Sequence, residues 1–116
     1  MSQNIDWTNF KTWIPDYANQ QATNKWASST TWTNNQGRGF VFVWLYSYNT
    51  TGPHEPVIWI NGKQVHRAIM EAYPPNTARA TGNSFVIPVA DGDVINYTGA
   101  GSINVRQLYF IPGRWV

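Results

Sequence analysis

The sequence contains no cysteine and few charged residues, and each shortage excludes a class of site. Without cysteine, neither disulfides nor thiolate metal sites can form. Only 12% of the 116 residues are Asp, Glu, Lys or Arg, against roughly 25% in an average soluble domain. The formal net charge is only +2. Because binding to phosphate backbones needs concentrated positive charge, we expect no nucleic-acid partner.

The chain also lacks a hydrophobic segment long enough to cross a bilayer. Its first residues, Met1 to Asn4, carry neither the basic nor the apolar region of a signal peptide. We therefore expect a protein that folds in the cytoplasm and does not insert into a membrane. A length of 116 residues allows one domain with a modest core.

Groups able to catalyse a reaction or bind a metal are scarce. The sequence has two histidines, no Gly-x-Ser-x-Gly motif and no His-x-x-x-His motif. His54 and Glu55 are adjacent, and in extended backbone adjacent side chains point apart. Asp91 and Asp93 flank Gly92 and could be imagined as calcium ligands, but two carboxylates fall short of a calcium site. A turn explains them better, so we expect no enzyme activity, cofactor or metal.

Aromatic residues, in contrast, are abundant. They make up 16% of the chain and include seven tryptophans and six tyrosines. With so few charges, the surface must consist largely of amides, hydroxyls, glycine and aromatic rings. Such surfaces suit contacts with sugars or with other proteins through stacking and neutral hydrogen bonds. The alternative is that the tryptophans simply form the core.

The residue pattern predicts an all-β fold. Glycine and proline punctuate the chain, and β-branched and aromatic residues fill the intervals between them. Asn61-Gly62 predicts a two-residue hairpin with positive φ at both positions. Pro88 predicts an edge or a bulge in its strand, because proline donates no backbone hydrogen bond. We expect an antiparallel β-sandwich or jelly roll with strands over residues 39–48, 57–60, 63–67, 84–89, 94–98 and 104–111, the last ending at Pro112-Gly113.

The N-terminal third is less regular than the rest. Residues 1–36 are expected to form an N-terminal arm and a first weak strand, and residues 37–116 the sandwich body of a single domain. Residues 6–14 are compatible with either a short helix or an extended arm. Residues 19–36 are polar apart from Trp26 and Trp32 and predict one weak strand and a loop.

The strand over residues 39–48 is apolar on both faces. One face carries Phe40, Phe42, Trp44, Tyr46 and Tyr48, and the other carries Val41, Val43 and Leu45. Because antiparallel sheets commonly expose one face to water, such a strand must be central in a sandwich or lie against another subunit. Closure around a three-fold axis would cover the second face. Which face forms that contact stays open, and the candidate interface residues are Phe40, Phe42, Val43, Trp44 and Tyr46.

The longer connections between strands are expected to cluster at one end of the sandwich. If consecutive strands are antiparallel, the turns at Asn61-Gly62 and Asp91-Gly92 share one end. The connections over residues 49–56, 71–83 and 99–102 then share the other end. Long loops on a rigid scaffold are the usual place for binding. The candidate ligand-binding residues are therefore His54, Glu55, Tyr73 and Arg79.

Five short motifs in order give the chain a family resemblance. They are Ile14-Pro15-Asp16-Tyr17, Gly39-Phe40-Val41-Phe42-Val43, Ile60-Asn61-Gly62, the run from Val86 to Ile95, and Tyr109-Phe110-Ile111-Pro112-Gly113. This succession, from Ile14 to Val116, resembles the small β-sandwich modules of bacteriophage tail fibres and head fibres. The resemblance implies a trimeric jelly roll on the virion surface, without enzymatic activity. Its implied partners are further copies of the chain, other virion proteins and a glycan or protein receptor on the host.

Three alternatives remain beside this interpretation. The chain could decorate a capsid or baseplate without binding a receptor. It could be a monomeric carbohydrate-binding module, which would need exposed aromatic rings as a stacking platform. An enzyme is the third alternative. The mass in solution separates the assembled module from the monomeric one.

Overall fold

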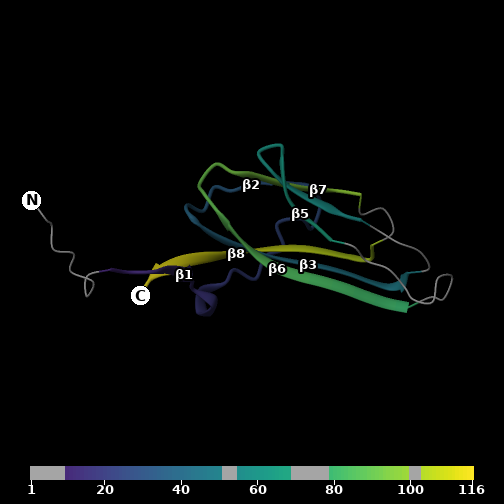
Figure 1. The fold of residues 1–116 in the computed structure, drawn as a ribbon, viewed down its shortest axis with the longest axis horizontal. Coiled ribbons are helices and arrows are strands. Elements are labelled where there is room, and N and C mark those ends of the chain that lie inside the picture. Colours follow the sequence, from purple (N-terminus) through teal and green to yellow (C-terminus); the bar gives the residue numbers. More distant parts are fainter. Residues whose placement is uncertain (1–9, 51–54, 69–78, 100–102) are drawn as a thin grey trace, which may run out of the picture.

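The computed structural model describes residues 10–50, 55–68, 79–99 and 103–116, which form two antiparallel sheets of four strands each (Figure 1). This confirms the predicted all-β sandwich. The elements are β1 (Trp13–Pro15), the 3-10 turn η2 (Tyr17–Asn19), β2 (Thr31–Thr33), β3 (Gly39–Thr50), β4 (Val57–Ile60), β5 (Lys63–Arg67), β6 (Arg79–Val89), β7 (Val94–Thr98) and β8 (Val105–Trp115).

The strand order identifies the sandwich as a jelly roll. The first sheet has the order β1-β8-β3-β6 and the second the order β2-β7-β4-β5. The antiparallel pairs are nested along the chain, because β4 pairs with β5, β3 with β6, β2 with β7 and β1 with β8. The chain is therefore arranged as one long hairpin rolled into two layers, which is the jelly-roll arrangement of eight strands.

Alternation along β3 builds the core between the two sheets. Val41, Val43 and Leu45 point inward and are fully buried. Successive residues of one strand point to opposite faces of a sheet, so the aromatic residues between these three point outward. The buried cluster brings both sheets together and contains Trp26, Val41, Val43, Leu45, Ile58, Ala68, Val89, Ile95, Tyr97, Ile103, Leu108 and Phe110.

The hairpin between β4 and β5 has the predicted turn. Asn61 and Gly62 have φ values of 52° and 77°, as a type I′ turn requires. The Asn61 side chain also reaches the next turn: its Nδ2 donates to Asp93 Oδ1 at 2.9 Å, and its Oδ1 accepts from the Val94 N–H at 2.9 Å. The two tight turns therefore lie at one end of the sandwich, as strand parity predicts.

Gly62→Val is expected to lower the free energy of unfolding by about 1 to 2 kcal/mol, because a β-branched residue resists positive φ. Urea denaturation measures the loss. The matched control is Lys63→Val, which places valine at an exposed strand position where that residue is favoured. Equal stability of Gly62→Val and the unaltered protein would contradict this explanation of the turn.

The Asp91 and Asp93 carboxylates accept hydrogen bonds from backbone N–H groups at this end of the sandwich. Asp91 Oδ1 accepts from the Gly37 N–H at 3.0 Å, and Asp93 Oδ2 accepts from the Ala90 N–H at 2.8 Å. Asn34, only 1% exposed, donates from its Nδ2 to the carbonyls of Gly37 and Ala90, each at 2.8 Å. These bonds satisfy the backbone of two adjoining loops, and they account for both aspartates as turn residues.

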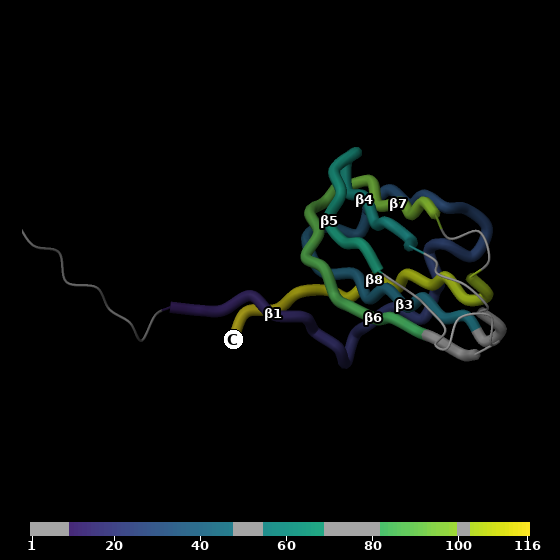
Figure 2. The backbone as a smooth tube through the Cα atoms, turned by 45° about the vertical axis from the view of Figure 1, so that its right-hand side comes forward, coloured from purple at the N-terminus to yellow at the C-terminus, as the bar shows by residue number. Residues whose placement is uncertain are grey.

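Strand β8 is longer than the sequence predicts. It does not stop at Pro112-Gly113 but continues to Trp115. The reason is a change of partner: Pro112 still pairs with Gly39 on β3, whereas Gly113 pairs with Pro15 on β1. Pro112 takes part through its carbonyl, which accepts from the Asp16 N–H at 2.8 Å. Residues 13–15 are extended, and β1 lies beside the end of β8 in Figure 2.

Pro88 lies in an edge strand, which is one of the two places that the sequence predicts for it. Its strand, β6, is at the edge of the first sheet, and Pro88 pairs with Phe40 on β3. An edge strand has a neighbour on one side only, so a missing N–H donor costs no bond on the open side.

Candidate functional site

The outer face of the first sheet carries a continuous group of aromatic side chains. We call it the aromatic face, and it consists of Phe40, Phe42, Trp44 and Tyr46 from β3 and Tyr109 from β8. The rings pack against one another across and along the strands. The centroids of Phe42 and Tyr109 are 6.4 Å apart and those of Trp44 and Tyr46 are 5.9 Å apart. The face thus presents a layer of packed rings.

The strands that flank β3 add no charge to this face. Opposite Phe42 and Trp44, β6 contributes Val86 and Ser84, and β8 contributes Gln107 beside Trp44. Trp44 and Val86 remain 37% and 36% exposed. Among the described residues that point outward from β3, β6 and β8 between Phe40 and Tyr46, none is ionisable at neutral pH.

The outer face of the second sheet differs from the aromatic face. Its strands β2 and β7 point Thr31, Thr33, Asn96 and Thr98 outward, and the one large ring there, Trp59, donates from its Nε1 to Thr98 Oγ1 at 2.8 Å. This is the polar outer face expected of an antiparallel sheet in water. The two outer faces therefore have different chemistry, one polar and the other aromatic.

One end of the aromatic face is covered by β1 and by the residues that pack on it. Trp13 of β1 stacks on Phe40 with a centroid separation of 6.5 Å. The Arg38 guanidinium lies over the rings of Trp13 and Trp115, at 4.6 and 5.6 Å from their centroids. Ile111, next to Phe40 on the same face, is fully buried. The open part of the face therefore extends from Phe42 to Tyr46.

Val43 does not belong with the other candidate interface residues. Its side chain points into the sandwich and is 0% exposed, whereas Trp44 next to it points outward. The sequence left open which face of β3 meets another subunit. The structure assigns the aliphatic face to the protein's own core, so Val43 has no surface for a partner to contact.

The candidate ligand-binding residues are only partly described. Glu55 is exposed and lies 3.8 Å from Arg67, and both side chains are more than half exposed, so this ion pair adds little stability. Arg79 begins β6, where its backbone pairs with Thr50. His54 and Tyr73 lie outside the described residues. The four residues therefore remain a prediction as a group.

The described residues that flank the longer connections lie at the same end of the sandwich. Thr50 pairs with Arg79, and the Ala68 N–H donates to the Pro56 carbonyl at 3.0 Å. Gly99 packs so closely on the Glu55 carbonyl that a Cβ would lie 2.9 Å from its oxygen. These contacts occur at the end of the sandwich opposite the Asn61-Gly62 turn.

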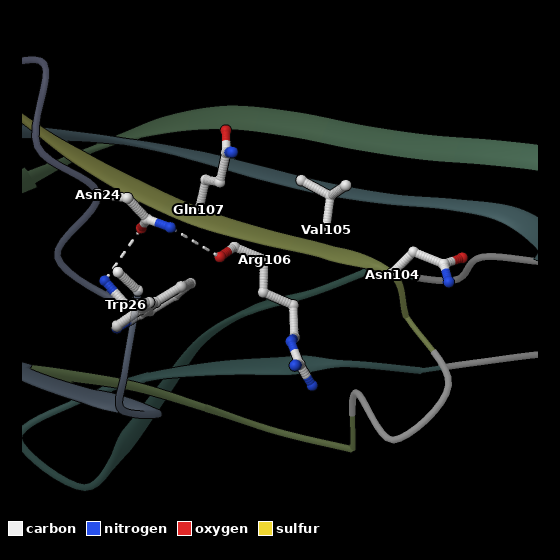
Figure 3. Close-up of a pocket in the computed structure, with 7 residues that line it drawn as sticks. Asn24, Trp26, Asn104, Val105, Arg106 and Gln107 are labelled. Atoms are coloured by element: carbon white, nitrogen blue, oxygen red, sulfur yellow. Dashed lines mark hydrogen bonds between the residues drawn. The ribbon is translucent and has the colours of Figure 1, made fainter.

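A groove lies along the side of the sandwich near this end. It consists of two adjoining depressions of about 230 and 320 Å³ that share Trp26, Ala27 and Arg106. The first continues to Asn24 and residues 104–107, and the second to residues 28–30 and Tyr97. Figure 3 shows the Arg106 side chain on the same side of β8 as Trp26, with Val105 and Gln107 on the opposite side.

Residues 20–30 form the wall of this groove by bridging the two sheets. The N–H groups of Gln21 and Lys25 donate to carbonyls of β8, and the Tyr97 N–H on β7 donates to the Thr30 carbonyl. Asn24 Oδ1 accepts from the N–H groups of Trp26 and Leu108, each at 3.0 Å. Trp26 is 3% exposed and its Nε1 lies 3.4 Å from the Ile95 carbonyl. Trp26 therefore lines the groove while its ring packs in the core.

Sequence reasoning did not find this groove. The sequence predicts a weak strand and a loop over residues 19–36 and assigns no site to Arg106. The groove depends on pairing between segments about 80 positions apart, such as Asn24 with Leu108. No local motif signals such a pairing.

Within residues 10–50, 55–68, 79–99 and 103–116, no three His, Cys, Asp or Glu side chains gather as metal ligands. No helix in the same residues has the length and hydropathy to span a bilayer. Comparison of the chain with known proteins finds no matching family model and no matching curated protein.

Proposed function

We propose that this protein is a non-enzymatic module of a bacteriophage virion surface, that it assembles as a trimer through the aromatic face, and that it takes part in attachment to the host. The observation that carries the proposal is the aromatic face itself. The jelly-roll topology and the resemblance of the ordered motifs to tail-fibre and head-fibre modules support the virion assignment.

The chemistry of the aromatic face favours other copies of this chain as the partner. The open part from Phe42 to Tyr46 carries no charge, so a partner must offer an apolar surface rather than a charged one. A second copy brings exposed Trp44 and Val86 as such a surface. Buried apolar area contributes roughly 25 cal/mol per Å². Closed rotational symmetry then satisfies every copy at once and leaves no apolar face open to water.

The competing function is a monomeric carbohydrate-binding module. One observation favours it: Trp44 and Trp115 remain 37% and 53% exposed in a single chain, and exposed rings can stack on sugar rings. In that case the aromatic face would stay open to solvent and the chain would have no reason to associate.

Size-exclusion chromatography with light scattering decides between the two functions. Three chains of 13.2 kDa each are expected to give a mass of about 40 kDa, because three-fold closure covers the aromatic face of every copy. A mass near 13.2 kDa at micromolar concentration would contradict the assembly and support the monomeric module. Binding of the labelled protein to bacterial cells, compared before and after removal of their surface polysaccharide, then tests attachment.

A further inference from the structure

We infer that the groove around Arg106 binds a carboxylate-bearing sugar of an acidic surface glycan, an inference that rests on the proposed attachment role. The site is distinct from the aromatic face, because Arg106 alternates with the outward residues of β8 and points to the inner side of the sheet (Figure 3). It lies on the side of the sandwich, at the end opposite the tight turns.

Arg106 supplies the charge of this site. It is the one side chain charged at neutral pH among the residues that line the two depressions. It forms no ion pair with any acidic residue of the described part of the chain, where the only such pair joins Arg67 to Glu55. A guanidinium without a carboxylate partner presents planar paired donors, and this geometry matches a carboxylate with two parallel hydrogen bonds.

The Arg106 side chain is exposed but is oriented by a contact with the opposite sheet. Its guanidinium carbon lies 5.6 Å from the centroid of the Tyr97 ring on the opposite sheet. Its backbone carbonyl accepts a hydrogen bond from Asn24 Nδ2 at 3.3 Å. A ring contact of this kind orients the cation and leaves its N–H donors available. Less side-chain freedom is then lost when a ligand binds.

The rest of the groove suits the hydroxyl groups of a sugar. Exposed Ser28, Ser29 and Thr30 line the depression next to Arg106. Ser29 Oγ accepts from the Thr31 N–H at 3.2 Å, which leaves its own hydroxyl hydrogen to donate elsewhere. Neutral donors and acceptors around a single cation are the groups that a sugar with one carboxylate can satisfy together.

Titration with glucuronic acid tests the inference, with glucose and acetate as matched probes. Glucose has the same ring with a hydroxymethyl group in place of the carboxylate, and acetate has the carboxylate without the ring. In nuclear magnetic resonance spectra, glucuronic acid is expected to shift the Trp26 indole N–H signal with saturation at millimolar concentrations. Glucose and acetate are expected to shift it much less. Equal shifts with glucose, equal shifts with acetate, or no saturable shift with glucuronic acid would overturn the inference.

Arg106→Gln is expected to weaken glucuronic acid binding at least about tenfold, because it removes a charge-assisted pair of hydrogen bonds. The matched control is Arg114→Gln on the same strand, an exposed cation at the other end of β8. The control is expected to bind as the unaltered protein does. Unchanged affinity in Arg106→Gln, with its melting temperature also unchanged, would show that the groove does not use this charge.

The mass of each titrated sample separates this inference from the proposed assembly. If the protein has a mass of about 40 kDa but does not bind glucuronic acid, the groove is not a sugar site and the proposed trimer is still supported. If the protein has a mass of 13.2 kDa and binds glucuronic acid through Arg106, the sugar site is supported and the proposed assembly is contradicted.

Discussion

Val43→Glu is expected to leave the protein unfolded. The Val43 side chain is 0% exposed and lies opposite Leu108 of β8 and Phe85 of β6 across the first sheet. An unpaired carboxylate in such a place costs several kcal/mol, and most domains have a total stability of only about 5–15 kcal/mol. Near-ultraviolet circular dichroism and thermal melting measure the outcome.

The matched control for this change is Val65→Glu. Val65 is also a strand valine, on β5, but it is 44% exposed. The same substitution there leaves the carboxylate in water, so the melting temperature is expected to stay within a few degrees of the original. A cooperative melting transition in Val43→Glu like that of the control would mean that the aliphatic face of β3 is not the core of the sandwich.

The fold could be predicted from the sequence because its main signals are local. Alternation of residues along β3, the Asn61-Gly62 dipeptide and the position of Pro88 each depend on a few neighbouring residues. The structure confirms each of them. The end of β8 could not be predicted in this way, because whether Pro112 and Gly113 continue a strand depends on β1, which lies about 100 positions earlier.

The candidate sites show the same difference between local signals and contacts made by distant segments. The sequence predicts that β3 has one aromatic and one aliphatic face, but the pattern alone could not say which of them is the core, so the candidate interface residues included the buried Val43. Only the second sheet, packed on Val41, Val43 and Leu45, decides that question. The Arg106 groove had no sequence signal, because Asn24, Tyr97 and Arg106 meet only after the sheets have formed.

The two outer faces of the sandwich also explain why the proposed trimerisation and the folding of the chain can be tested separately. The second sheet, with Thr31, Thr33 and Asn96 outward, is complete in a single chain. In the first sheet, the inner face is covered by the second sheet, and Trp13 covers the outer face at Phe40. A change in the open part of the aromatic face therefore affects association more than it affects the core.

Trp44→Glu is expected to convert the proposed trimer into monomers without unfolding the chain. Trp44 is 37% exposed and is the most exposed ring of the aromatic face. A carboxylate there is solvated in the monomer but loses its water in the proposed contact, where an unpaired charge costs several kcal/mol at every interface. Light scattering is expected to give a mass near 13.2 kDa, with the near-ultraviolet spectrum still that of a folded protein.

Two further variants decide whether Trp44→Glu acts through the contact. Thr33→Glu places the same charge on the outer face of the second sheet, where Thr33 is exposed, and is expected to remain trimeric. Trp44→Phe keeps an apolar ring and is also expected to remain trimeric, although its dissociation constant rises because less apolar area is buried. If Trp44→Glu keeps the mass of about 40 kDa expected for a three-fold assembly, the contact lies elsewhere. If Thr33→Glu dissociates as well, the trimer is sensitive to added charge in general, and the aromatic face loses its special role.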